Sequence, residues 1–203
     1  MNLVIDSQYF PSIIYYKISY NSTNILFEQC ETYQKMSFRN RCQIAGGEGV
    51  IDLSIPLAGG RDQKALMRDI RVGSGQGWQA RHWKTIVSCY SRSPWFEYYQ
   101  SGLEALFRRP AGFLVDWNMA CFEWSLRALG MSKTMGLTEH YRKDYGPDEG
   151  VDWRGKILPK NRGEWGESRY RQVFEERTGF IPNLSILDLL FCEGKEAIRY
   201  IQS

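Results

Sequence analysis

The first thirty residues alternate between short apolar runs and polar segments. Residues 3–7 hold one apolar run and residues 24–28 a second, and both have the length of a β-strand. The segment between them is compatible with a helix that starts at Pro11 and Ser12. This order predicts a β-α-β unit with parallel strands, so residues leaving both strands meet at one edge of the sheet. The residues expected at that edge are Gln8, Tyr9, Gln29, Cys30 and Glu31.

A β-hairpin is predicted next, with its turn at residues 46–49, Gly-Gly-Glu-Gly. Glycine supplies the positive φ angles that tight turns require. The second strand alternates cleanly, with Ile51, Leu53 and Ile55 on the side expected to face the core. Residues 69–72 predict one further strand.

From Gly77 onward the apolar spacing becomes helical. Three helices are predicted, over residues 78–90, 95–108 and 113–129, the last closed by Gly130. Glycine, proline and charged residues interrupt any pattern between 132 and 170, which predicts a mostly irregular loop. Short helices are predicted again after residue 170. The longest of them has Asn183 as its N-cap.

Together these elements predict one domain of the α/β class. Residues 1–75 are predicted to form mainly a mixed sheet, which is built from a β-α-β unit and a β-hairpin. Residues 76–131 are helices, 132–170 the irregular loop, and 171–203 the C-terminal helices that complete the helical cover. A chain of 203 residues is long enough for one well-formed core.

Composition narrows the function only a little. The net charge of +3 is weakly basic, so we expect no nucleic-acid partner. Five scattered cysteines, with no C-x-x-C pair, disfavour a zinc site or a disulfide framework, and no metal or cofactor is indicated. No signal peptide or membrane-spanning run is seen, and we expect a cytoplasmic protein. Aromatic residues make up 14% of the chain, enough for a large core or for stacking on a sugar or base.

The densest polar motif lies just before the hairpin. Lys35, Arg39, Asn40 and Arg41 fall within seven residues. If the strand begins near Phe38, both arginines point to the same face and offer paired N–H donors to a phosphate or carboxylate. The alternative is an ordinary solvated strand face.

Two further residues could take part in proton transfer or nucleophilic attack. His82 lies on the apolar face of a predicted helix, where it is either a hydrogen-bonded core residue or a general acid or base. Cys30 could pair with His82 as a nucleophile, or simply pack as a free thiol. Glu28 and Glu31, at the same sheet edge, could bind a metal or act as a base, or could be ordinary strand-end carboxylates. No glycine-rich phosphate loop of the common types occurs.

Several ordered motifs, taken together, resemble the WbqC-like family of bacterial proteins. They are Gln8-Tyr-Phe-Pro11, Tyr33-Gln-Lys35, Ser37-Phe-Arg-Asn-Arg-Cys42, Leu53-Ser-Ile-Pro56, the Trp78 to Trp83 segment with His82, Ser93-Pro-Trp-Phe-Glu-Tyr98, and the tail from Tyr170 to Leu190. Members of this family often carry histidine at the position of Cys30 and asparagine at that of Cys192. The family was named from an O-antigen context, so the resemblance implies a role in surface polysaccharide biosynthesis without naming a step.

The resemblance and the motifs together lead to two hypotheses. In the first, the protein is a transferase for an anionic sugar or nucleotide sugar. Lys35, Arg39 and Arg41 then bind the anion, Asn40 orients a polar group and His82 moves the proton, with Gln8 and Tyr9 beside the substrate. Arg39→Ala or Arg41→Ala would weaken ligand binding without unfolding the protein. In the second, it is a non-enzymatic partner of an envelope biosynthesis enzyme, and Trp95, Phe96, Tyr98 and Tyr99 form an exposed patch.

Overall fold

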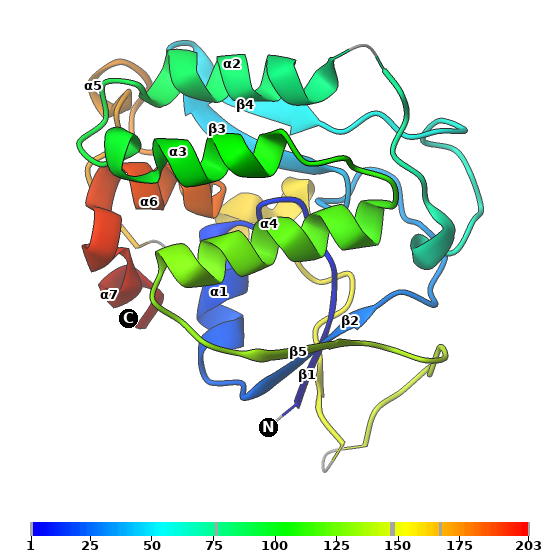
Figure 1. Cartoon of the computed structure of the whole chain (residues 1–203). Helices are drawn as coiled ribbons and strands as arrows, with labels where there is room; N and C mark the ends of the chain where they lie inside the picture. Colours follow the sequence, from blue (N-terminus) through cyan, green and yellow to red (C-terminus); the bar gives the residue numbers. More distant parts are fainter. Residues whose placement is uncertain (1, 76, 147–148, 167, 203) are drawn as a thin grey trace.

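A parallel four-stranded sheet lies at the base of the molecule. The computed structural model describes residues 2–75, 77–146, 149–166 and 168–202. Strands β1 (Asn2–Asp6) and β2 (Asn24–Glu28) pair in parallel, and α1 (Ile13–Tyr20) connects them (Figure 1). The predicted β-α-β unit is thus confirmed. Leu3, Val4 and Ile5 are all buried, because β1 lies inside the sheet with neighbours on both sides.

The outer strands of this sheet come from the segment predicted to be irregular. β5 (Thr134–Leu137) pairs with β2, and β6 (Val151–Asp152) pairs with β1, which gives the order β5-β2-β1-β6. The prediction of a loop over 132–170 is wrong at these two places. Strands of four and two residues carry too few positions to show a period of two, and Gly136 lies within one of them.

Phe122 joins the sheet to the helices that cover it. It lies on α4 (Leu114–Ala128), and its ring centroid is 5.2 Å from that of Tyr16 on α1. Phe27 of β2 contacts the same ring from the sheet, with centroids 5.4 Å apart. One aromatic side chain, that of Phe122, therefore connects a strand, the crossover helix and a helix much later in the chain.

The hairpin forms a second, separate sheet. β3 (Arg41–Gly46) and β4 (Gly49–Ser54) are antiparallel, with Cys42 opposite Leu53 and Ile44 opposite Ile51. The predicted inward positions are correct. β3 begins at Arg41 rather than near Phe38, because the Phe38 carbonyl accepts a hydrogen bond from the Tyr9 N–H instead of from the hairpin partner.

Three helices lie one above another across the front of the molecule, as Figure 1 shows. They are α2 (Trp78–Tyr90), α3 (Phe96–Phe107) and α4, close to the predicted bounds. Gly130 follows α4 with φ of +67°, as expected of a glycine that ends a helix. The strand predicted at 69–72 is absent. The short 3₁₀ helix η1 (Met67–Asp69) occupies its start, and Arg71 and Val72 form only isolated bridges.

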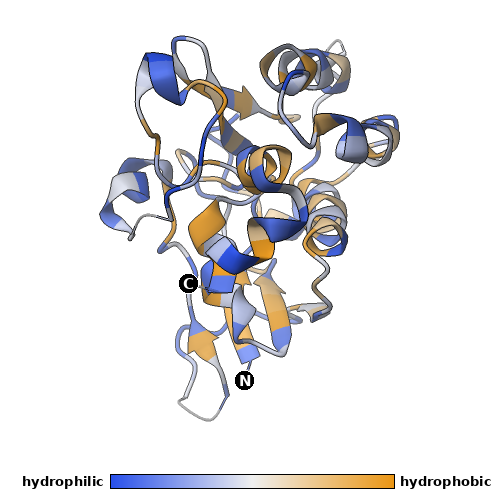
Figure 2. Cartoon of the chain, turned by 90° about the vertical axis from the view of Figure 1, so that its left-hand side faces the viewer, coloured by the Kyte–Doolittle hydropathy of each residue, from blue (hydrophilic) through white to orange (hydrophobic). Residues whose placement is uncertain are grey.

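The C-terminal part holds short helices around one buried helix. η2 (Pro159–Glu164) and α5 (Glu175–Thr178) precede α6 (Ile186–Glu193), and η3 (Gly194–Glu196) and α7 (Ala197–Gln202) follow it. Apolar residues of the helices face the interior in Figure 2. The N-cap of α6 is Ser185, whose Oγ accepts the Leu187 N–H. The prediction of Asn183 as N-cap is wrong by two residues, because Asn183 takes a positive φ of 50°.

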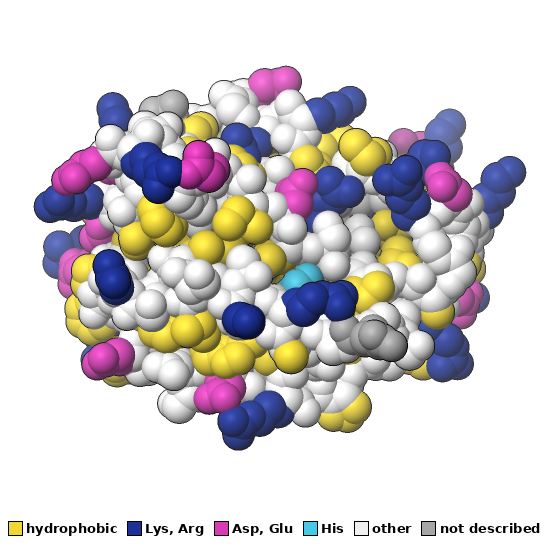
Figure 3. Space-filling view, turned by 90° about the horizontal axis from the view of Figure 1, so that it is seen from above, with side chains coloured by type: hydrophobic (Ala, Val, Ile, Leu, Met, Phe, Trp, Pro, Cys, Tyr) yellow, Lys and Arg dark blue, Asp and Glu magenta, His cyan; other side chains and the backbone are white. Residues whose placement is uncertain are grey.

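Two surface properties bear on function. Seen from above, basic side chains are spread among acidic and apolar ones and form no continuous patch on that face (Figure 3). Within the described ranges, none of the helices has the length and apolar character needed to cross a membrane.

Gly194 provides a test of how tightly α6 and α3 pack. Its φ is +57°, and a Cβ at this position would overlap the Trp95 ring. Gly194→Ala should therefore lower the free energy of unfolding by about 2 to 4 kcal/mol, from steric overlap and backbone strain together. Urea denaturation would measure the change.

Gly130→Ala is the matched control, because its φ is also positive but nothing lies within 4 Å of the added Cβ. It should cost about 1 to 2 kcal/mol, from the backbone conformation alone. Equal losses in the two variants would mean that the contact with Trp95 does not restrict this position.

Candidate functional site at the carboxyl edge of the parallel sheet

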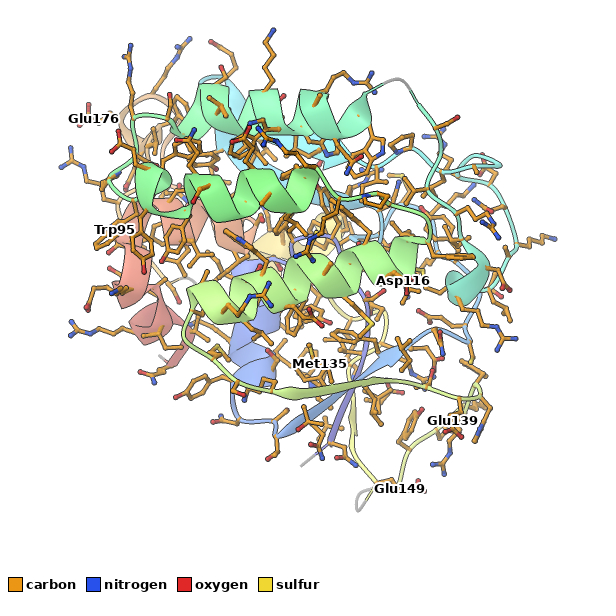
Figure 4. The ribbon with its side chains drawn as sticks, in the orientation of Figure 1. Trp95, Asp116, Met135, Glu139, Glu149 and Glu176 are labelled. Carbon is orange, nitrogen blue, oxygen red and sulfur yellow. The ribbon has the colours of Figure 1, made fainter. Side chains whose placement is uncertain are left out.

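The carboxyl ends of the parallel strands bring several acidic residues together. Asp6, Glu28 and Asp152 are the last residues of β1, β2 and β6. Thr138 follows β5, and the labelled Glu139 marks this end of the strand in Figure 4. Ligands of open α/β sheets commonly bind just beyond this edge, which makes it the first place to look for a site.

Asp6 is buried at the centre of the edge. Its Oδ1 accepts the Gly155 N–H at 2.8 Å, and its Oδ2 accepts the Gln8 side-chain amide at 2.9 Å. Arg39 Nη1 lies 3.8 Å from the same Oδ2. The first strand end is therefore tied both to the loop after β6 and to the segment before the hairpin.

Glu28 forms the second centre. Its Oε1 accepts the Cys30 N–H at 2.8 Å and the Thr138 hydroxyl at 2.7 Å, while its Oε2 accepts Arg154 Nη1 at 2.9 Å. Arg154 also pairs with Asp152 at 2.7 Å. The sequence analysis missed Arg154, because a single arginine in a glycine-interrupted segment carries no spacing signal.

Glu31 connects this network to an open cavity. Its Oε1 accepts Arg39 Nε at 3.1 Å and also contacts Arg39 Nη2, while Arg39 Nη1 donates to Gln34 at 3.2 Å. Cys30, Glu31, Thr32 and Tyr141 line a cavity of about 380 Å³. Burial raises the pKa of Glu31, and Arg39 opposes that rise only in part. A carboxylate with a raised pKa beside a cavity is suited to accept a proton.

The edge carries more negative than positive groups. Four carboxylates, those of Asp6, Glu28, Glu31 and Asp152, are joined to two arginines, Arg39 and Arg154. Tyr141 and Tyr145 lie against Arg154, with their ring centroids 5.2 and 5.0 Å from its Cζ. In the described part of the chain no cluster of three or more His, Cys, Asp or Glu residues could hold a metal ion.

The basic motif before the hairpin is distributed over separate contacts. Arg39 is fully buried, with its donors directed at Glu31, Gln34 and Asp6. Arg41 is partly exposed, and its Nη1 lies 3.6 Å from Asp52 on the facing strand. Lys35 is exposed and pairs with Asp62 at 2.6 Å. The two guanidinium groups therefore do not form an open anion-binding fork, because each already has a carboxylate neighbour.

Asn40 also has a partner within the protein. Its side-chain amide donates to the Ile55 carbonyl at 3.0 Å, and its Oδ1 accepts the Tyr33 hydroxyl at 2.9 Å. It joins the hairpin entrance to the end of β4, so its visible role is structural.

His82 lies inside the molecule rather than at the cavity. Its Nδ1 is 3.0 Å from the Tyr9 hydroxyl, and its ring packs between those of Tyr9 and Trp78. Burial lowers the pKa of His82 to about 4, although a backbone hydrogen bond with Ser54 opposes the shift. At neutral pH the imidazole is uncharged and forms a buried pair with Tyr9.

Cys30 has different neighbours from those expected of a Cys-His pair. Its Sγ lies 3.5 Å from the Thr138 carbonyl oxygen and 3.8 Å from Arg68 Nη1. The structure thus brings Gln8, Cys30, Glu31 and Arg39 to one edge. Tyr9 and His82 lie deeper, and Lys35, Asn40 and Arg41 lie along the hairpin side.

Comparison with known proteins identifies the family. The family model described as the WbqC-like protein family matches residues 6–153 of this chain, which includes the carboxyl ends of all four parallel strands but not Arg154. The chain belongs to the WbqC-like family. No match was found among curated proteins or among solved structures. The resemblance inferred from the sequence is confirmed for its motifs up to Tyr98, while the tail from Tyr170 to Leu190 lies outside the matched residues.

The structure changes what we expect of Arg39→Ala. Removing the guanidinium leaves Asp6 and Glu31 without their counter-charge, which should lower the free energy of unfolding by about 3 to 5 kcal/mol at pH 7. Arg41→Ala is the control, because its partly exposed pair should contribute at most about 1 kcal/mol. Urea unfolding of both variants tests this.

The loss in Arg39→Ala should also depend on pH. Without arginine nothing opposes the burial that raises the pKa of Glu31, so the penalty is absent below about pH 4 and grows as the pH rises. A loss that equals that of Arg41→Ala, or that does not change with pH, would contradict the role assigned to Arg39.

His82 makes stability depend on pH in the opposite direction. The folded-state pKa of His82, about 4, lies below the usual 6.5. Its contribution to the free energy of unfolding is therefore complete above pH 6.5 and is lost as the pH falls toward 4. The full contribution is about 3 kcal/mol. His82→Gln should flatten the curve of unfolding free energy against pH over this range.

NMR titration of the imidazole signals gives an independent value for the same pKa. The chain has two histidines, and the exposed His140 can be assigned with His140→Gln. A His82 signal that titrates near 6.5 would show that the ring is not held neutral by burial.

Proposed function

We propose that the protein is a transferase of surface polysaccharide biosynthesis and that its active site is the cavity at Glu31. The observation that carries this proposal is that Glu31 belongs to the buried acid and arginine network and also lines the cavity. The membership of the WbqC-like family supports the biological setting, and the carboxyl edge of a parallel sheet is a common place for such a site.

Glu31 would act as the general base. Its carboxylate accepts the proton of a sugar hydroxyl or amine, while that oxygen or nitrogen forms the new bond to the transferred group. The leaving group departs from the donor with the electron pair of the broken bond. Burial raises the pKa of Glu31 and so strengthens it as a base, and Arg39 keeps the carboxylate oriented.

Tyr141 would bind the sugar ring. Its side chain is 54% exposed, it lines the cavity, and Arg154 lies against the ring at 5.2 Å. Aromatic faces commonly pack against the apolar face of a sugar. Cys30 and Thr32 form the remaining wall of the cavity.

The charge of the edge favours a particular kind of acceptor. The four network carboxylates outnumber their two arginines, and this excess of negative charge favours hydroxyl or ammonium donors at Glu31, while Arg68 adds one cation beside Cys30. We therefore propose that the reacting end of the sugar is neutral or carries an amine. The anionic sugar expected from the sequence has no open arginine pair to bind it here, because Arg39 is engaged by Glu31 and Gln34.

The alternative of a non-enzymatic partner protein has less structural support. It depends on an exposed patch at the start of α3, but Phe96 and Tyr99 are buried in the core. Tyr98 is exposed at 59%, and Trp95 is partly buried. Single exposed aromatic residues of this kind are common on protein surfaces.

A ligand screen by thermal shift tests the proposed site. Purified protein is combined with amino sugars, neutral sugars, sugar phosphates, nucleotide sugars and acyl donors, and a ligand at 100 times its Kd should add about 2.7 kcal/mol of stability. A hydroxyl- or amine-bearing sugar should raise the melting temperature of the wild type. The shift should fall sharply in Glu31→Gln and Tyr141→Ala.

Glu139→Gln is the matched control, since Glu139 is exposed beside the same strand end. It should leave the shift unchanged. A ligand whose shift survives both Glu31→Gln and Tyr141→Ala binds elsewhere. If every ligand in the panel behaves so, or none binds, the proposed active site is wrong.

A further inference from the structure

A groove lies between α3 and the end of α4. Its volume is about 700 Å³, within the range of small-molecule sites. It shares no lining residue with the cavity at Glu31. In Figure 4 the labelled Trp95, at the start of α3, and Glu139, beyond β5, lie at opposite sides of the molecule.

The side chains that line this groove carry the opposite charge to those at the carboxyl edge. Three cations line it, those of Arg109, Arg127 and Lys195, and no carboxylate is among the described lining residues. Arg127 has only a distant pair with Glu123, at 3.9 Å between exposed atoms, and Lys195 Nζ lies 5.6 Å from the Tyr98 ring centroid. For Arg109 the described residues offer no ion-pair partner. Arg109 and Lys195 thus have no carboxylate partner among the described residues, and Arg127 has only this distant pair, so all three can meet a negative ligand.

Aromatic surface lies beside these cations. Tyr98, Tyr99 and Trp124 all line the groove. Trp124 packs edge-on against Tyr99, with ring centroids 6.1 Å apart, and its ring carries an indole N–H. It is one more donor on a wall that otherwise offers hydroxyl and cationic groups.

Gly102 keeps this aromatic surface open. It lies inside α3, where glycine costs about 1 kcal/mol relative to alanine. A Cβ at this position would come within 3.3 Å of Trp124 Nε1. The absence of a side chain therefore leaves the indole edge accessible from the groove, at a cost in helix stability.

We infer that the α3–α4 groove binds an anionic ligand that carries a flat ring, of the nucleoside diphosphate class. The ring packs against Tyr98 and the Trp124 edge, and the phosphates meet Arg109, Arg127 and Lys195. Arginine suits phosphate because its paired N–H groups match two oxygens at once. This site is independent of the proposed transferase site, because it uses none of the same residues.

Isothermal titration calorimetry with uridine diphosphate tests the inference. Wild-type protein should bind it, and Arg109→Ala and Arg127→Ala should each weaken the affinity by about tenfold or more. Arg108→Ala is the matched control, because Arg108 pairs with Glu104 at 2.6 Å and lies outside the groove. It should leave the affinity unchanged, as should Glu31→Gln.

Two further measurements distinguish the contribution of the flat ring to binding from the contribution of the phosphates. Inorganic pyrophosphate should bind more weakly than uridine diphosphate, and uridine more weakly still. Gly102→Leu should abolish binding by filling the groove while the thermal melt still shows a folded protein, because the gain in helix propensity offsets the close approach to Trp124 Nε1. Absence of binding to the wild type, equal losses in Arg108→Ala and Arg109→Ala, or unchanged affinity in Gly102→Leu would each overturn the inference.

Discussion

The architecture of this protein depends on one buried guanidinium. Arg39 is completely enclosed, and its donors reach Glu31 and Gln34 from its own segment and Asp6 from the end of β1. The Arg39 carbonyl in turn accepts the side-chain amide of Asn118, which also donates to the Ser7 carbonyl. A single residue thus joins the parallel sheet, the entrance to the hairpin and α4. Buried ion pairs add little net stability but are costly to break, so this contact enforces one arrangement of the three parts.

A second buried carboxylate plays a similar part for the C-terminal helices. Asp188 lies on α6 and accepts the Tyr90 hydroxyl of α2 and the Tyr170 hydroxyl, each at 2.6 Å. The Tyr90 oxygen also accepts the Ala45 N–H of the hairpin. Burial raises the pKa of Asp188, and the two hydroxyl donors counter that effect. The helices are therefore placed by directional hydrogen bonds as well as by apolar packing.

The sequence predicted those parts of the fold that repeat a period over many residues. The β-α-β unit, the alternation around Leu53 and the three long helices all follow from apolar spacing. β5 and β6 could not be predicted, because strands this short are specified by pairing with β2 and β1 rather than by their own pattern. Arg39 was singled out as an anion-binding residue, whereas the structure engages it with partners that are distant in sequence or outside regular structure. Whether a cation is free or engaged is a tertiary property that its neighbours in sequence do not reveal.

The same reasoning explains why the charged motif before the hairpin suggested an anion site. Local sequence shows four polar or basic residues close together, and only the fold shows that Asp6, Glu31 and Asp52 face them. After this neutralisation the carboxyl edge is left with surplus acceptors, and unpaired positive charge remains at Arg109 and Lys195 in the α3–α4 groove. A net charge of +3 over the chain therefore conceals two surfaces of opposite chemistry. If each surface selects its ligand by local charge and hydrogen-bonding groups, the proposed donor-bearing sugar and the inferred anionic ring compound would be recognised by one small domain without competing.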